Sequence, residues 1–317
     1  MDYKNNLVKP VLFMVFNRPE KTKIVWDEIR KAQPRKLYIS IDGPRQGVDA
    51  DIVKCKKVRD IVYDVDWECD VKYLDHDKNK GCSLAGKTAF DWVFRHEQEM
   101  IQLEDDVVPT QSFFWFMQEM LEKYKNNDKI CYVCAENYGI KNGNATYFFS
   151  QYGGSWGWAT WKRVYDKWEY KLDSLEHMLE SKAFRNNFSS KFEYDYWVRA
   201  FKSWKYIGGN TYDLQTIYLI RKESMMNIIP NINLVTNIGW DLEASNTKVS
   251  SSHDPAAQKF GNIPSFEIDK IVHPDIIEIS KETDNKWFKY HFQNRSKISY
   301  RLRWFLGNFL RKLKVIK

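Results

Sequence analysis

The chain has 317 residues, of which 16% are aromatic, and a formal net charge of +7; this length can bury one large core or two modest ones. Eight lysines and arginines and no acid lie in residues 295–317, so residues 1–294 carry a net charge of −1. A nearly neutral body has no extended basic face, which excludes nucleic acid as the expected partner.

The N-terminal residues carry no recognisable targeting signal. Residues 1–10 are mostly polar, and the apolar run Val11–Phe16 is too short for a secretory signal or a membrane span. The five cysteines are an odd number scattered through predicted core elements, which suits reduced thiols. We therefore expect a cytoplasmic protein.

Strand and helix patterns alternate through the first 135 residues. Strands are predicted at Val11–Phe16, Leu37–Ile41, Val71–Leu74, Met100–Leu103 and Ile130–Ala135, and helices at Glu20–Ala32, Asp49–Val62, Ser83–Arg95 and from Thr110 onward. This alternation is typical of an α/β fold in which helices flank a mainly parallel sheet with right-handed connections.

Polar residues gather just after the carboxyl end of each predicted strand. They are Asn17, Arg18, Asp42, Asn79, Lys80, Glu104, Asp105 and Asp106. The carboxyl ends of parallel strands meet at one edge of a sheet, where nucleotides bind in open α/β folds. The pattern therefore predicts a nucleotide crevice at this edge.

The three consecutive acids Glu104, Asp105 and Asp106 repel one another and need a positive partner. Oxygen ligands suit Mg²⁺ or Mn²⁺, which takes one or two protein carboxylates together with substrate phosphates. The alternative is a solvated acidic turn that caps the helix starting near Thr110. The neighbouring strand ends favour the metal.

Four motifs in order resemble a GT-A type nucleotide-diphospho-sugar transferase, in a bacterial group distantly similar to the eukaryotic N-acetylglucosaminyltransferase I family. The motifs are Phe16-Asn17-Arg18-Pro19, Ser40-Ile41-Asp42-Gly43-Pro44, Asn79-x-Gly81 and Leu103-Glu104-Asp105-Asp106. The resemblance covers residues 10–250 and implies a Rossmann-like nucleotide-binding sheet with an acceptor-side subdomain.

The resemblance also implies roles for the strand-end residues. Asp42 would accept a hydrogen bond from the base N–H of a uridine-type nucleotide, although a turn residue before Gly43 explains it equally in isolation. The acids would be a variant of the Asp-x-Asp motif, with Asp106 on the metal and Asp105 on the ribose or a metal-bound water. The nucleotide would also contact Asn17, Arg18, Asn79, Lys80 and Glu104.

The second half opens with the loop Gly153–Trp161, rich in glycine and tryptophan, before a helix through Arg163. Glycines let the backbone approach a ligand, and indole faces stack on sugars. The resemblance implies donor or acceptor sugar contacts for Trp156, Gly157 and Trp158. A tryptophan-rich core joint is the alternative.

An inverting sugar transfer needs a carboxylate that takes the proton of the acceptor hydroxyl. Asp213 lies just before an apolar helix and 17 residues before Pro230, an arrangement that resembles the family's catalytic acid. Its other reading is a helix N-cap. Asp195 in Glu193-Tyr194-Asp195 is the alternative candidate, although it lies earlier than the resemblance implies.

The sequence departs from the family pattern at the last expected metal ligand. After the strand and loop that lead to Gly239, the resemblance implies a histidine as a last metal ligand, but residues 241–247 contain none. Asn246 is a poor substitute, and His253 is the candidate that replaces it.

The C-terminal residues 295–317 form the pattern of a basic amphipathic helix. Apolar residues from Leu302 to Ile316 recur at helical spacing, and Trp304 lies among the cations. This pattern indicates a membrane-surface anchor, whereas packing on the core is the alternative. The predicted organisation is a catalytic domain at 1–249, with a nucleotide-binding half at 8–135 and an acceptor half at 136–249, a connector at 250–294 and the C-terminal helix.

The sequence thus predicts a metal-dependent, inverting glycosyltransferase that moves a sugar from a UDP-sugar to a glycan or lipid-linked acceptor in surface polysaccharide synthesis, at the inner face of the cell membrane. The alternative is a catalytically decayed, membrane-tethered module that binds sugars or nucleotides. A nucleotidyltransferase would carry a glycine-rich basic phosphate loop near the N-terminus, and Asn17-Arg18-Pro19 is not such a loop.

Overall fold

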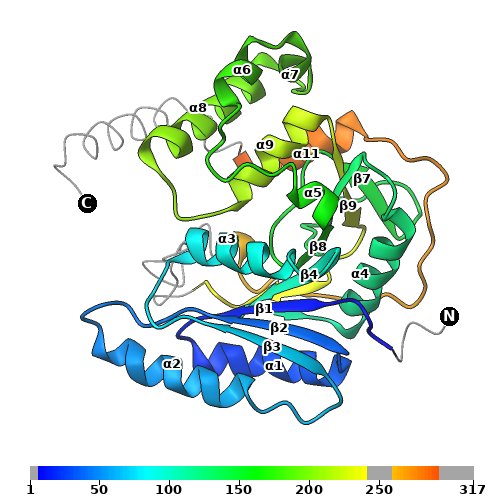
Figure 1. Cartoon of the computed structure of the whole chain (residues 1–317). Coiled ribbons are helices and arrows are strands. Elements are labelled where there is room, and N and C mark those ends of the chain that lie inside the picture. The colour runs from blue at the N-terminus through cyan, green and yellow to red at the C-terminus, as the bar shows by residue number, and fades with distance from the viewer. Residues whose placement is uncertain (1–5, 241–258, 293–317) are drawn as a thin grey trace.

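The computed structural model describes residues 6–240 and 259–292 (Figure 1). Its strands are β1 (Val11–Val15), β2 (Lys36–Ile41), β3 (Asp70–Asp75), β4 (Glu99–Glu104), β5 (Val107–Pro109), β6 (Ile130–Cys134), β7 (Tyr147–Ser150), β8 (Trp158–Trp161), β9 (Met226–Pro230) and β10 (Val235–Asn237). Its helices include α1 (Pro19–Ala32), α2 (Asp49–Val62), α3 (Cys82–Val93), α4 (Gln111–Tyr124), α5 (Lys162–Tyr165), α6 (Leu175–Glu180), α7 (Lys182–Asn186), α8 (Lys191–Ile207), α9 (Asp213–Glu223) and α11 (Lys281–Phe292).

Eight strands form one central sheet in the order β3-β2-β1-β4-β8-β6-β9-β7. The four strands from β3 to β4 are parallel neighbours, and β6 and β9 are also parallel. Helices α1 and α2 lie on one side of β1, β2 and β3, and α3 lies on the other (Figure 1). The predicted α/β fold, with a mainly parallel sheet flanked by helices, is confirmed.

Local sequence explains where the first helices begin and end. Pro19 occupies the first turn of α1, where its missing N–H costs nothing. Gln33 ends α1 in the left-handed conformation. Thr110 caps α4 by accepting a hydrogen bond from the Phe113 N–H, so α4 begins directly after the short strand β5 that follows the acids.

The prediction of a loop over Gly153–Trp161 is wrong for its last four residues. Residues 158–161 form β8, which lies between β4 and β6 and is antiparallel to both. All four residues are buried. Because β8 runs opposite to its neighbours, its first residue, Trp158, lies beside Gln102 and Cys134, near the carboxyl ends of β4 and β6. Trp156 comes two residues earlier, at the same edge of the sheet.

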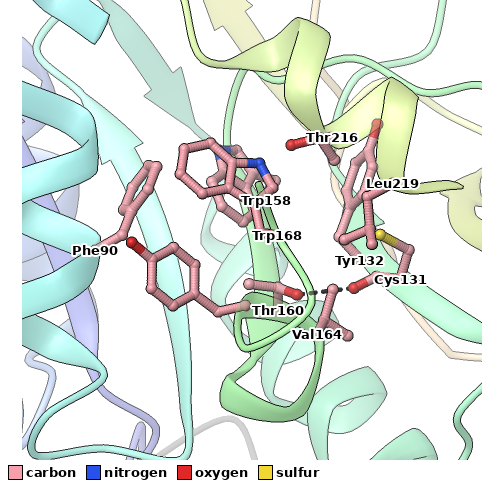
Figure 2. A pocket seen from close by; sticks show the side chains of 10 residues that line it. Phe90, Cys131, Tyr132, Trp158, Thr160, Val164, Trp168, Thr216 and Leu219 are labelled. Atoms are coloured by element: carbon pink, nitrogen blue, oxygen red, sulfur yellow. Dashed lines mark hydrogen bonds between the residues drawn. The ribbon is translucent and has the colours of Figure 1, made fainter. Parts of the chain in front are cut away.

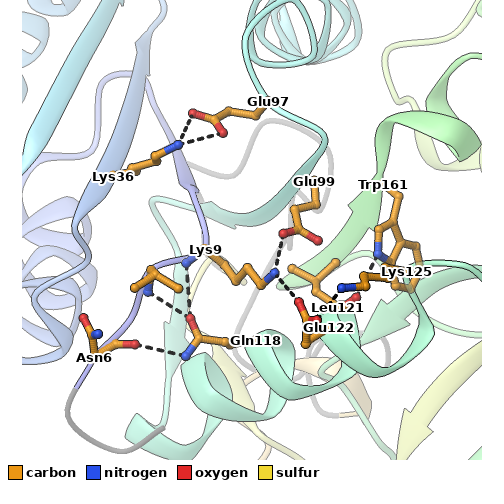
Figure 3. A network of polar contacts seen from close by, with 11 residues as sticks. Asn6, Lys9, Lys36, Glu97, Glu99, Gln118, Leu121, Glu122, Lys125 and Trp161 are labelled. Carbon is orange, nitrogen blue, oxygen red and sulfur yellow. Dashed lines mark hydrogen bonds and ion pairs between the residues drawn. The ribbon is translucent and has the colours of Figure 1, made fainter. Parts of the chain in front are cut away.

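A polar network joins the segment before β1 to α4 and β4 (Figure 3). Lys9 Nζ lies 2.5 Å from Glu99 Oε1 and 3.0 Å from Glu122 Oε2. Gln118 accepts hydrogen bonds from the Lys9 and Val8 N–H groups and donates one to the Asn6 carbonyl. The network lies at the amino end of β1 and β4, opposite to the edge where the acids lie, so it serves the scaffold.

Helix α11 falls within the predicted connector but packs on the body. Trp287 and Phe288 are buried, and the Asp284 carboxylate accepts hydrogen bonds from the Ser150 hydroxyl, 2.5 Å away, and from the Gln151 N–H. The predicted C-terminal helix and His253 lie outside the described residues. Within residues 6–240 and 259–292, no helix is long and apolar enough to cross a membrane.

Candidate active site

Arg18 supplies positive charge to the acid triplet. It precedes α1, just after β1, and its Nη1 lies 2.6 Å from Asp106 Oδ2, while its Nη2 forms an ion pair with Asp105 Oδ1. The Phe16 N–H also donates to Asp105 Oδ2 at 3.2 Å. Burial alone would lower the pKa of Arg18, but the charges of Asp105 and Asp106 outweigh it and raise the pKa.

Asp106 has one buried oxygen without a partner. The residue is 8% exposed, and its Oδ1 makes no hydrogen bond within the described structure. Burial raises the pKa of Asp106 although Arg18 lowers it. Gly239 approaches so closely that a Cβ there would lie 1.9 Å from Asp106 Oδ2. Only glycine fits beside this carboxylate without displacing it.

Glu104 connects the triplet to the second half of the chain. The Tyr212 hydroxyl donates a hydrogen bond to Glu104 Oε1, and Tyr212 immediately precedes α9. Burial and the charge of Asp106 raise the pKa of Glu104 to about 7. More negative charge is therefore gathered at this edge than Arg18 neutralises.

Glu136 was not among the predicted site residues. It lies two residues after β6 and is 4% exposed, and its Oε2 has no hydrogen-bond partner within the described structure. Burial raises its pKa to about 8, and the nearby charges of Asp213 and Glu104 act in the same direction. The rule that identified Glu104 after β4, a polar residue just past a buried strand, would have identified Glu136 after β6.

Asp213, the favoured catalytic candidate, is the first residue of α9. Its side chain is exposed to solvent, yet desolvation by the surrounding protein raises its pKa. Its charge acts on Tyr132, Glu136 and Tyr212, which places it beside the other acids.

The alternative candidate Asp195 has an ordinary surface environment. It lies on α8 and forms an ion pair with Lys191 one turn earlier, 2.7 Å away. The charge of Asp213, in contrast, acts on Glu136 and Tyr212. The choice of Asp213 over Asp195 as the catalytic acid stays a prediction.

Asp42 organises the loop after β3. Its carboxylate accepts hydrogen bonds from the N–H groups of Gly43, Lys80 and Gly81 and from the Asn79 amide. Both oxygens are engaged, so these contacts support the turn role that was its alternative reading. A contact with a nucleotide base stays a prediction.

The other predicted nucleotide contacts differ in how freely they could meet a ligand. The Asn17 amide donates to Asp51 Oδ1 at 2.6 Å, and Asp51 is also paired with Arg45. Lys80 is exposed at the rim of the loop. Arg18, Asn17 and Asn79 are thus each held by neighbouring carboxylates, and Arg18 and Lys80 are the predicted contacts that carry positive charge.

The two tryptophans of the Gly153–Trp161 segment lie in different environments. Trp158 is 9% exposed and meets the rings of Phe90 and Tyr132 at 5.5 and 6.1 Å. Figure 2 shows it on a small apolar cavity formed by α3, β6, β8, α5 and α9. These contacts support the core-joint reading for Trp158. Trp156 is only half-buried, so it is better placed to meet a sugar.

Gly157 allows the turn between these two tryptophans. Its φ is +66°, a conformation that L side chains rarely adopt. A Cβ there would also lie 3.1 Å from atoms of Phe113 and Val235. The fold itself therefore requires glycine at position 157. A sugar contact by the Gly157 backbone stays a prediction.

The acids fit a divalent cation of the kind that binds few protein ligands. Within the described residues, no group of three or more His, Cys, Asp or Glu side chains is arranged to hold a metal. Mg²⁺ and Mn²⁺ need only one or two carboxylates when phosphates and waters complete the shell. The unpartnered Asp106 Oδ1 and the excess negative charge at Glu104 suit such an ion.

Three solved structures indicate what the chain is similar to. UDP-glucose pyrophosphorylase complexed with UDP-glucose aligns at 11% identity and a TM-score of 0.36, over 72% of this chain and 91% of that one. Its apo form aligns at 10% identity and 0.37, over 73% and 93%. The 4-diphosphocytidyl-2C-methyl-D-erythritol synthase of Anaerococcus prevotii DSM 20548 aligns at 11% and 0.33, over 59% and 81%. No known protein family and no curated protein matches the sequence.

Proposed function

We propose that the chain is a metal-dependent, inverting glycosyltransferase of the GT-A type that moves a sugar from a UDP-sugar to a glycan or lipid-linked acceptor. The observation that carries the proposal is the set of charged groups at the carboxyl edge of the sheet: Arg18 with Asp105 and Asp106, and Asp213 linked to Glu104 through Tyr212. Parallel strands present this edge to nucleotides in open α/β folds.

Arg18 and the acids suit a diphosphate bound with a cation. A guanidinium is planar and always charged, which matches phosphate oxygens. Asp106 and Glu104 would hold Mn²⁺ or Mg²⁺, which supplies the charge that neutralises a diphosphate leaving group. Arg18 already lies against Asp105 and Asp106, so a diphosphate that binds there meets a guanidinium held in place.

Asp213 is the proposed general base. The acceptor oxygen forms a bond to the anomeric carbon of the sugar while the bond from that carbon to the diphosphate breaks. The proton of the acceptor hydroxyl passes to the Asp213 carboxylate, and the electron pair of the broken bond leaves with the nucleoside diphosphate. Desolvation raises the pKa of Asp213, which makes its carboxylate a stronger base in this step.

Calorimetric binding of UDP, GDP, CMP and dTDP, each with and without Mn²⁺, tests the proposal on the wild type and on Asp106→Ala. We expect UDP binding that depends on Mn²⁺ and is lost in the variant. Asp60→Ala is the control, because Asp60 is exposed and pairs with Lys56 on α2. If no nucleotide binds under any condition, the proposal of a transferase is contradicted, and the alternative of a decayed, membrane-tethered module is favoured.

The reaction type needs its own assay. Mn²⁺-dependent release of UDP from a UDP-sugar supports transfer or slow hydrolysis of the sugar. Release of pyrophosphate from UTP with a sugar phosphate, without UDP release from the UDP-sugar, would instead identify a nucleotidyltransferase. Residues 295–317, the predicted membrane anchor, are tested by sedimentation of the full chain with anionic lipid vesicles.

A further inference from the structure

Glu136 is a buried carboxyl group whose hydrogen bonding is incomplete. The Tyr138 hydroxyl and the backbone N–H of Trp156 lie close enough to favour its charged form, but Oε2 has no hydrogen-bond partner within the described structure. A buried polar atom left unpaired costs about 1–3 kcal/mol. A buried, unpaired polar atom in a native structure calls for an explanation. The function proposed above assigns no role to Glu136.

The Glu136 carboxyl group occupies the space that a side chain at position 154 would fill. A Cβ on Gly154 would lie 0.6 Å from Glu136 Oε1. Gly154 does not have a positive φ, so the backbone conformation is not what requires glycine. The absence of a side chain at position 154 matters because Glu136 fills the place of that side chain.

The position of Glu136 in the sheet separates it from the proposed phosphate site. Glu136 follows β6 and the acid triplet lies at the carboxyl end of β4, with β8 between the two strands. Neighbouring strands are about 4.8 Å apart, so the ends of β4 and β6 lie roughly 10 Å apart. Trp156 comes just before β8 at the same edge. A donor that binds Arg18 through its diphosphate would have to extend its sugar past Trp156 to reach Glu136.

The surroundings of Glu136 favour a neutral, hydroxylated ligand. The charges of Asp213 and Glu104 act on Glu136, so an anion such as a phosphate would be repelled. Burial raises the pKa of Glu136 to about 8, so at pH 7 the group is mostly neutral and can donate or accept. The ring of Tyr138 lies 6.3 Å from that of Trp156, and aromatic faces suit the C–H surfaces of a pyranose ring.

We propose that Glu136 is a specificity-determining residue for the donor sugar: its Oε2 forms a hydrogen bond with one hydroxyl group of the sugar, whose apolar face lies against Trp156. This assignment rests on the proposed function, because it takes the sugar to be carried on a nucleoside diphosphate that meets Arg18. Glu136 then distinguishes UDP-sugars from UDP, and one sugar from another.

Calorimetric titration of UDP, UDP-glucose and UDP-N-acetylglucosamine in the presence of Mn²⁺ tests this inference. We expect Glu136→Ala to bind UDP within about twofold of the wild type but to lose about tenfold in affinity for the preferred UDP-sugar, the effect of one hydrogen bond. Glu136→Gln keeps a donor and an acceptor of the same shape, so it should lose less. Gly154→Ala, which displaces the carboxyl group without removing it, should behave as Glu136→Ala does.

Glu97→Gln is the matched control, because Glu97 lies before β4 at the opposite end of the sheet, near Lys36. Thermal melts of every variant show that it is folded. The inference is overturned if the wild type binds UDP-sugars no better than UDP, or if Glu136→Ala weakens UDP and UDP-sugar equally. Loss of the Mn²⁺ dependence in Glu136→Gln would make Glu136 a metal ligand instead. Failure of the wild type to bind any of the three contradicts the proposed function itself.

Discussion

Arg18 and Asp106 form an ion pair in which Nη1 and Oδ2 lie 2.6 Å apart, at an edge where Glu104, Asp105 and Asp106 come together. The guanidinium is 15% exposed and the Asp106 side chain 11%. A charge that loses its partner in such a setting is much more costly than one on the surface. The stability of this edge therefore depends on Arg18.

Arg18→Ala should lower the free energy of unfolding by about 3–5 kcal/mol at pH 7, because it removes the guanidinium that is hydrogen-bonded to two buried carboxylates. The loss should shrink at pH 5, since the pKa of Asp106 is already raised and rises further without Arg18, so acid neutralises it. Arg30→Ala is the control. Arg30 pairs with the exposed Asp64 and Asp66, and its loss should cost about 1 kcal/mol or less. Urea unfolding at both pH values measures the effect, and equal costs for the two variants would contradict it.

The pKa of Glu104, raised to about 7 by burial and by Asp106, predicts how stability varies with pH. An acid with a raised pKa in the folded state ionises first in the unfolded state, near pH 4.5. The folded protein should therefore lose stability as the pH rises from about 4.5 to about 7, with little further change from this group above that range.

Glu104→Gln should flatten this part of the curve of unfolding free energy against pH. Glu122→Gln is the opposite control: Lys125 and Lys9 lower the pKa of Glu122, so its carboxylate favours folding at neutral pH and its removal should not flatten the decline. Denaturant unfolding at intervals between pH 4.5 and 9 decides the matter. An unchanged slope in Glu104→Gln would show that Glu104 ionises normally.

The first half of the fold was predictable because local patterns define it. The strand β1 reads as continuous apolar residues, and α1 begins at Pro19, so their bounds follow from neighbouring residues. The strand β8 was missed because it is four residues long and follows a glycine-rich turn. What makes it a strand is pairing with β4 and β6, and such non-local pairing leaves little local signal.

The candidate site was predictable where residues follow a strand directly. The acids after β4 and Arg18 after β1 were identified in this way, and they do contact one another. The hydrogen-bond partners of Asp42 and Asn17 are distant in sequence, in the loop after β3 and in helix α2, so the sequence did not show that these two side chains are already engaged. Glu136 was missed because its significance comes from an unpaired oxygen and the space left by Gly154, which only a folded chain displays.

Asp213→Asn should lower the rate of sugar transfer by about 10²–10⁴-fold while leaving UDP binding within about twofold, because a general base acts in the chemical step rather than in nucleotide binding. Asp195→Asn should keep wild-type activity, since Asp195 forms only an exposed i,i+4 ion pair with Lys191 among the contacts described. Initial rates of UDP release, measured beside calorimetric UDP binding, separate the two effects. Reversed phenotypes would move the proposed base to Asp195.

Trp158 and Trp156 should respond oppositely to truncation. Trp158 meets Phe90 and Tyr132 in the core, so Trp158→Ala should cost about 3–5 kcal/mol of unfolding free energy. Trp156 is half-buried beside Tyr138, so Trp156→Ala should cost clearly less. It should instead weaken UDP-sugar binding several-fold and leave UDP binding unchanged. Urea unfolding and calorimetry on both variants measure the pair. If Trp156→Ala destabilises the fold as much as Trp158→Ala and spares UDP-sugar binding, both tryptophans belong to the core joint and the sugar lies elsewhere.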